Sequence, residues 1–182
     1  IANCNNIHFY KTKFNHSDYG DYVRRLGTKI TLKNNIKSLG YLDADNSFEK
    51  NHISTVLKVH NETRKNIIIS NRNFITNDIE IFEDNSDFFD TNQITFFGEK
   101  IKIGLLWGRY PRQLSLIGDR IISNYIKNYH VNDIAFTNKN TVNYSFSKIP
   151  RKKVNDFKTW YERDYYKYKP KFKKVFGFDL QL

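Results

Sequence analysis

The spacing of the apolar residues differs between parts of this chain, and that difference limits the folds open to it. From Lys29 to Trp107, apolar residues alternate with polar ones or form short runs, as they do in β-strands. From Leu114 to Tyr129 they recur every three or four residues, as they do along one face of an α-helix. The chain must therefore combine a β-sheet with packed helices.

The alternating segments predict strands joined by short turns. One hairpin joins residues 54–60 to 65–70 through a turn at 61–64, and it includes the run Ile67-Ile68-Ile69. A second hairpin joins residues 93–97 to 100–107 through the turn Gly98-Glu99. Further strands are predicted at residues 29–32, 79–84, 131–137 and 141–149.

Three helices are expected. Pro111 suits the first position of a helix, where its missing N–H costs nothing. The apolar face of that helix consists of Leu114, Ile117, Ile121, Tyr125 and Tyr129. Within it, Gly118 lowers helix stability by about 1 kcal/mol relative to Ala. A last helix with an aromatic face starts at 155 or 156 and ends at Pro170, and a short one is expected at 19–26.

This order of elements predicts the fold class. Strands followed by a helix, more strands and a final helix indicate an α+β fold, with a mostly antiparallel sheet, a central helix and a C-terminal helix. Strict alternation of strands and helices is absent, which argues against a doubly wound nucleotide-binding fold. A length of 182 residues fits a single domain over 1–182, with 1–18 as a candidate flexible tether.

The net charge points to an anionic partner. Thirty Lys and Arg face nineteen Asp and Glu, which gives +11. Such a field attracts nucleic acid, anionic membranes or acidic proteins. Residues with A/T-rich codons are abundant, with 15 Phe and 12 Tyr against 8 Gly and 3 Pro. An A/T-rich genome therefore accounts for part of the lysine excess, and the charge is weaker support for nucleic acid than its size indicates.

Three arginines around the start of the Pro111 helix form a candidate anion-binding site, namely Arg109, Arg112 and Arg120. A helix N-terminus offers free N–H groups, and guanidinium groups add charge-assisted hydrogen bonds to a phosphate, sulfate or carboxylate. The alternative is that these arginines are solvated, or pair with the acidic segment 83–90.

Basic residues flank the aromatic C-terminal helix and could bind nucleic acid or an acidic partner. Aromatic rings among lysines stack on single-stranded bases while the lysines neutralise phosphates. Aromatic residues at helical spacing are, however, more often part of a core. The candidates are Arg151, Lys152, Lys153, Lys167, Lys169, Lys171, Lys173 and Lys174.

The single cysteine, Cys4, rules out an intramolecular disulfide. The sequence Ile1-Ala2-Asn3-Cys4 resembles the lipidation signal of bacterial lipoproteins, although Asn3 stands where such signals usually carry Gly, Ala or Ser. The resemblance implies that Cys4 carries a lipid. A cysteine without a function is the alternative.

These patterns favour a non-enzymatic binding or accessory protein of a bacterial cell envelope, lipoprotein-like, with a basic surface for an anionic ligand or acidic protein. A nucleic-acid-binding subunit of a ribosomal or viral assembly is the alternative. An enzyme acting on an anionic substrate near Arg109 is a third reading. We assign no catalytic residue, metal ligand or cofactor from the sequence, because the five histidines are scattered without a metal-binding spacing.

Overall fold

The computed structural model describes residues 7–75, 81–83, 88–110, 112–145, 170, 172–174 and 176–178. At its centre is a six-stranded sheet in which β3 (Ile67–Ile75) lies between β5 (Ile94–Phe97) and β6 (Ile134–Ser145). The shorter strands extend it: β1 (Ser38–Gly40) pairs with β5, β2 (Ser47–Phe48) with β6, and β4 (Ile81–Glu83) with β3.

The sheet is mixed. Strands β3 and β6 run parallel over the longest pairing, from Ile67 opposite Ile134 to Ile75 opposite Ser145. The other four pairings are antiparallel. The predicted α+β class is confirmed. The prediction of a mostly antiparallel sheet is corrected to a mixed sheet, because the longest pairing is parallel. Parallel neighbours require a long crossover, and the chain between β3 and β6 supplies one that contains β5 and a helix.

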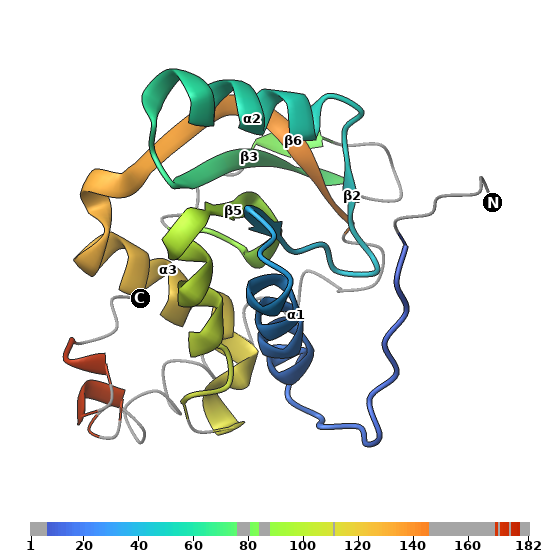
Figure 1. The fold of residues 1–182 in the computed structure, drawn as a ribbon, viewed down its shortest axis with the longest axis vertical. Coiled ribbons are helices and arrows are strands. Elements are labelled where there is room, and N and C mark those ends of the chain that lie inside the picture. Colours follow the sequence, from blue (N-terminus) through green and yellow to red (C-terminus); the bar gives the residue numbers. More distant parts are fainter. Residues whose placement is uncertain are drawn as a thin grey trace.

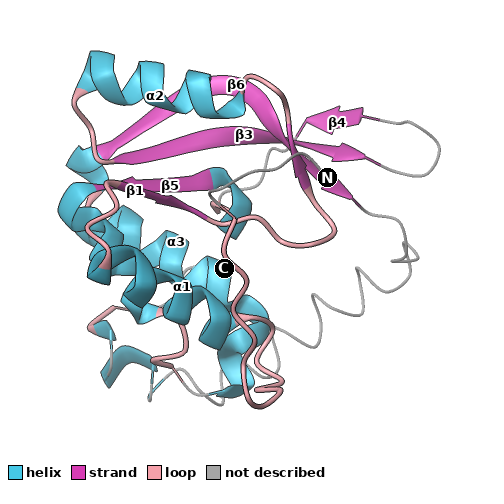
Figure 2. Ribbon diagram, turned by 45° about the vertical axis from the view of Figure 1, so that its right-hand side comes forward, coloured by secondary structure: helices cyan, strands magenta, loops and turns pink. Residues whose placement is uncertain are grey.

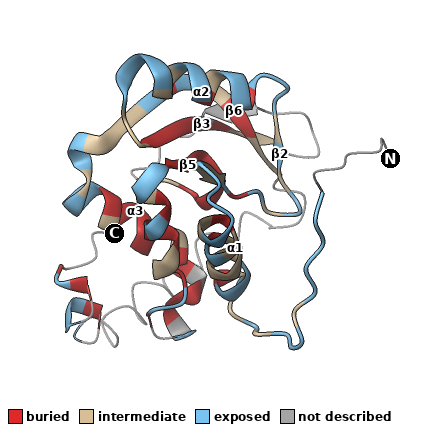
Figure 3. Ribbon diagram, viewed as in Figure 1, coloured by how far each residue is buried: buried red, intermediate tan, exposed pale blue. Residues whose placement is uncertain are grey.

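Helices cover both faces of this sheet. α1 (Asp21–Lys33) and α3 (Gly118–Tyr129) lie on one face, and α2 (His52–Thr63) lies on the other (Figures 1 and 2). The alternation of β3 explains both contacts, because Ile67 and Ile69 pack in the main core with α3, whereas Ile68 packs against α2. Figure 3 shows the buried residues concentrated on β3, β5 and the inner side of α3.

The strand predicted at 54–60 is wrong, because these residues belong to α2. His52 and Val56 are buried on the inner face of the helix, and Val59 and His60 lie on the same face. Two of these four inward-facing residues are therefore histidines. His52 Nδ1 lies 2.8 Å from Thr141 Oγ1 and its ring stacks on Phe48, which ties α2 to the edge of the sheet.

The strand predicted at 29–32 is also wrong, since it forms the end of α1. There Thr31 Oγ1 donates a hydrogen bond to the Gly27 carbonyl one turn earlier, as Thr28 Oγ1 does to the Arg24 carbonyl. The short helix predicted at 19–26 is confirmed and is longer than expected.

Two further corrections concern turns. Residues 100–107, predicted as a strand, fall mostly within the 3₁₀ segment η2 (Gly98–Leu106), which packs on α1. Over the described residues, the strands predicted at 131–137 and 141–149 are replaced by the single strand β6, preceded by the 3₁₀ turn η4 (Val131–Asp133). Residues 146–149 lie outside the described part of the chain. Asn138 has φ 51° and the register shifts there, so the polar residues after Thr137 form a bulge instead of a hairpin turn.

Two shorter 3₁₀ segments complete the description: η1 (Thr91–Gln93) precedes β5, and η3 (Arg112–Ile117) leads into α3. The central helix therefore begins at Gly118, later than the Pro111 start that the sequence suggests. The helix predicted after 155 lies mostly outside the described residues. Among the helices that are described, none is long and apolar enough to cross a bilayer.

Candidate functional site

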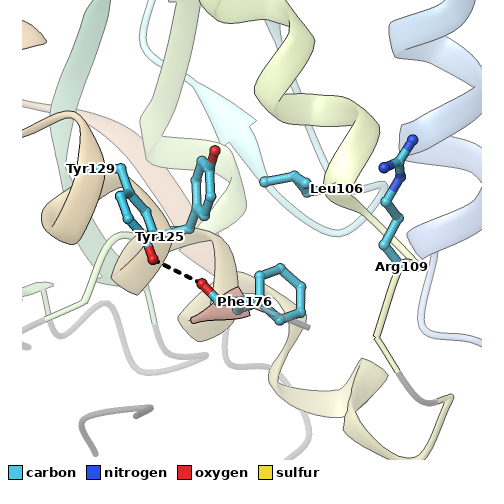
Figure 4. A pocket seen from close by; sticks show the side chains of 5 residues that line it. All are labelled: Leu106, Arg109, Tyr125, Tyr129 and Phe176. Atoms are coloured by element: carbon cyan, nitrogen blue, oxygen red, sulfur yellow. Dashed lines mark hydrogen bonds between the residues drawn. The ribbon is translucent and has the colours of Figure 1, made fainter. Parts of the chain in front are cut away.

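A pocket of about 290 Å³ opens beside the C-terminal half of α3. Its lining comes from the end of η2, the loop after it, α3 and the C-terminal region, through Leu106, Arg109, Tyr125, Tyr129 and Phe176. Figure 4 shows the two tyrosines side by side, Phe176 near them, and Arg109 across the pocket beyond Leu106. The pocket thus has an aromatic wall facing a cation.

Helical spacing places the aromatic wall. Tyr125 and Tyr129 are one turn apart and continue the face of α3 that buries Ile121. Their ring centroids are 5.0 Å apart. The Tyr129 hydroxyl donates a hydrogen bond of 2.9 Å to the carbonyl of Phe176, and the Phe176 ring stacks on buried Phe172. These contacts hold Phe176 against α3 and fix the wall.

Arg109 supplies the charge. Its backbone N–H donates to the Leu106 carbonyl at 3.0 Å, and this turn holds its exposed side chain at the pocket. Its guanidinium has no ion pair with a carboxylate of the described residues. A planar, permanently charged group opposite aromatic rings suits an anion attached to a flat apolar body.

The other two predicted arginines are placed elsewhere. Arg112 donates through Nε and Nη2 to the Ser17 carbonyl, at 3.2 and 3.1 Å, and so holds the segment before α1. Arg120 lies over the ring of Phe88, 4.6 Å from its centroid. Of the three arginines in the predicted anion site, only Arg109 lines the pocket.

A buried acidic residue lies where α1 and α3 begin, at the other end of α3 from Tyr125 and Tyr129. Asp21 is 1% exposed, and neither carboxylate oxygen has a hydrogen bond of ordinary geometry with a described group. Burial raises the pKa of Asp21 to about 6, although Ser115, Tyr110 and Arg24 oppose the rise. The hydroxyl of Tyr110, also buried, faces the same junction over Gly118.

A second polar group lies between β3 and α3. Arg72 and Asp90 are 4% and 6% exposed and form an ion pair at 3.4 Å, so Asp90, at the end of the acidic segment, is paired with an arginine that the sequence did not single out. Burial, and then the charge of Asp90, raise the pKa of Asp119 to about 7. A carboxyl group with such a pKa can exchange protons at neutral pH, but neither aspartate lines the Arg109 pocket.

Of the basic residues predicted to bind nucleic acid or an acidic partner, the structure describes only two. Lys173 and Lys174 are exposed next to the turn of chain that carries Phe176. The remaining candidates lie outside the described residues, as does Cys4; they are Arg151, Lys152, Lys153, Lys167, Lys169 and Lys171. Over the described ranges, no three His, Cys, Asp or Glu side chains are grouped closely enough to hold a metal ion.

No protein family model matches the chain, and no curated protein or solved structure resembles it significantly. A function must therefore be argued from the residues themselves.

Proposed function

We propose that this chain is a non-enzymatic binding protein whose aromatic pocket takes an anionic ligand with a flat apolar body. The observation that carries the proposal is the position of Arg109, an exposed guanidinium without a carboxylate partner in the described structure, opposite Tyr125 and Tyr129. The rings contribute stacking area, and the guanidinium contributes a charge-assisted hydrogen bond.

The size of the pocket limits the ligand. A volume of about 290 Å³ lies at the lower end of the range for small-molecule sites. It suits one or two fused rings with a single carboxylate, sulfonate or phosphate. The net charge of +11 adds a long-range attraction that is expected to speed the arrival of any anion.

Calorimetric titration with naphthalenesulfonate, and with naphthalenemethanol as a neutral analogue, tests the proposal. We expect the sulfonate to bind the wild type, and R109A to weaken it about tenfold, because a hydrogen bond to a charged group is lost. R109K keeps the charge without the planar guanidinium group, so it should lose less affinity for the sulfonate than R109A does.

R112A is the matched control, because the Arg112 guanidinium is held by the Ser17 carbonyl outside the pocket. It should bind the sulfonate as the wild type does. Equal loss in R109A and R112A would mean that net charge alone attracts the ligand. If the alcohol binds as tightly as the sulfonate, or if neither binds, the proposal is wrong.

We further propose that the domain is tethered in a bacterial cell envelope through a lipid on Cys4. The support is the lipoprotein-like start together with the exposed segment that precedes α1 and runs along the outside of the domain, in which Phe9 is 93% exposed (Figure 1). Mass spectrometry of the N-terminal peptide from the native host tests it. A diacylglyceryl group on Cys4 supports tethering, and an unmodified Cys4 excludes it.

A nucleic-acid partner is the competing reading, and Lys173 and Lys174 near Phe176 are the described residues that favour it. Binding of a single-stranded oligonucleotide across a salt series decides between the two. Phosphate contacts make the affinity fall steeply with salt. A steep fall, together with displacement of naphthalenesulfonate, would favour nucleic acid; no binding at physiological salt would reject it.

A further inference from the structure

The loop that carries Arg109 has two faces with different surroundings. Leu106 and Arg109 face the pocket, whereas Trp107 and Tyr110 are 1% and 5% exposed and face the junction of α1 and α3. The loop therefore contacts both the pocket and the buried carboxyl group of Asp21. Tyr110 also contacts the pocket wall, because its ring centroid is 6.2 Å from that of Phe176.

No cation of the described residues lies close enough to Asp21 to neutralise an ionised carboxylate there fully. Arg24 is the nearest cation, with Nη1 4.0 Å from Asp21 Oδ1, but its Nη2 is 2.5 Å from Asp43 Oδ1. Asp18, from the residues before α1, adds a second negative charge nearby. From the facing elements, Tyr110 and the Ser115 hydroxyl point at the carboxyl group, and Asp119 at the start of α3 acts on Tyr110.

From this geometry we propose that Asp21 regulates the pocket: when its carboxyl group loses a proton, the affinity for an anionic ligand beside Arg109 falls. This inference rests on the proposed function and adds its regulation. Its basis is the shared loop, one side of which contacts the buried acid while the other side presents the ligand-binding guanidinium.

Two physical effects act in the same direction. A negative charge on Asp21 is expected to oppose a second negative charge beside Arg109, and burial strengthens that repulsion. A buried carboxylate also attracts a neighbouring donor more strongly than a neutral carboxyl group does, and here that donor is the hydroxyl of Tyr110. A shift of Tyr110 moves the loop that carries Arg109.

The pH range follows from the raised pKa of Asp21, about 6 instead of 3.8. Below that value the carboxyl group is protonated and the pocket binds anions tightly. Above it the group is ionised and affinity declines. His130 is the rival explanation, because its ring lies 5.5 Å from that of Tyr125 and it too can gain a proton as pH falls. Burial and Lys100 lower the pKa of His130.

The test is the affinity of the full chain for naphthalenesulfonate between about pH 5 and about pH 8 at constant ionic strength, because a sulfonate keeps its charge throughout. We expect the wild type to bind at least about fivefold more weakly at the upper end. D21N should bind with nearly constant affinity, close to that of the wild type at low pH. H130Q should keep the pH dependence.

The outcomes separate the two proposals. If the wild type binds the sulfonate with the same affinity at every pH, the regulation by Asp21 is wrong and the proposed function stands. The same conclusion follows if the pH dependence persists in D21N and disappears in H130Q. Absence of binding at every pH overturns both.

A second measurement needs no variant. Coupling is reciprocal, so saturating sulfonate must lower the acid dissociation constant of Asp21 by the same factor and thereby raise its pKa. Carbon-13 NMR of the carboxyl groups in the wild type follows this directly. A titration of Asp21 that the ligand leaves unchanged overturns the regulation even if D21N fails to fold.

Discussion

Asp21 and Gly118 meet where α1 and α3 begin, and the absence of a side chain on Gly118 allows the contact. A β-carbon at residue 118 would lie 2.9 Å from Asp21 Oδ1 and 3.0 Å from the Trp107 ring, and closer still to the Tyr110 hydroxyl. Helix propensity alone favours Ala over Gly by about 1 kcal/mol. The tertiary contact reverses that preference.

G118A should therefore lower the free energy of unfolding by about 1–3 kcal/mol, the usual cost of overpacking. G27A is the matched control, because Gly27 also lies in a helix and a β-carbon there would meet no atom within 4 Å. It should be neutral or stabilise the protein by up to about 1 kcal/mol. Thermal unfolding measures both, and equal stabilisation by the two variants would contradict the packing described around Asp21.

Asp21 should also make stability depend on pH. Its pKa is raised in the folded state, so the folded protein holds this proton more tightly than the unfolded chain does. Stability is then lost as pH rises from the unfolded value of 3.8 through about 6. A shift of this size corresponds to about 3 kcal/mol.

D21N removes that loss. We expect it to match the wild type below about pH 4 and to exceed its free energy of unfolding by up to about 3 kcal/mol above about pH 7. Denaturant unfolding at both ends of the range measures the difference. Because Asp119 titrates in an overlapping range in both proteins, the comparison between them isolates Asp21. A D21N variant that is less stable at every pH would show that the carboxylate is paired.

Breaking the ion pair between Arg72 and Asp90 should lower the free energy of unfolding strongly. Replacing Arg72 by Met leaves a buried carboxylate without its cation, and the expected loss is roughly 3–5 kcal/mol. K58M is the control, since Lys58 and Glu62 form an ion pair at 3.9 Å whose side chains are 72% and 60% exposed. That exposed pair should contribute less than about 0.5 kcal/mol. Similar losses in the two variants would contradict the burial of the Arg72 pair.

Runs of apolar residues allowed the centre of the sheet to be predicted. Ile67-Ile68-Ile69 is a continuous apolar segment, residues 94–97 are apolar or aromatic except for Thr95, and both segments lie in strands. Periodicity failed in α2, because over seven residues an alternating pattern and a helical stripe overlap, and the histidines of that stripe do not read as apolar. The parallel pairing of β3 with β6 depends on tertiary contacts that no local pattern reveals.

The candidate site was only partly predictable. Arg109 stood out because it precedes a helix, but Tyr125 and Tyr129 at helical spacing indicated core, and α3 carries them past the edge of the core into the pocket wall. No local sequence pattern singled out Asp21. Its surroundings include residues nearly one hundred positions further along the chain, such as Tyr110 and Ser115, and only the fold brings them together.

The position of β6 in the sequence has a consequence for synthesis. β6 pairs with both β3 and β2, yet it begins only at Ile134, long after β3 ends at Ile75. On the ribosome, Ile67, Ile68 and Ile69 emerge long before the strand that covers their free edge, at a translation rate of roughly 5–20 residues per second. For some seconds the nascent chain presents an apolar strand with an unpaired edge, which is the kind of segment that chaperones bind, and the sheet closes only after β6 has emerged.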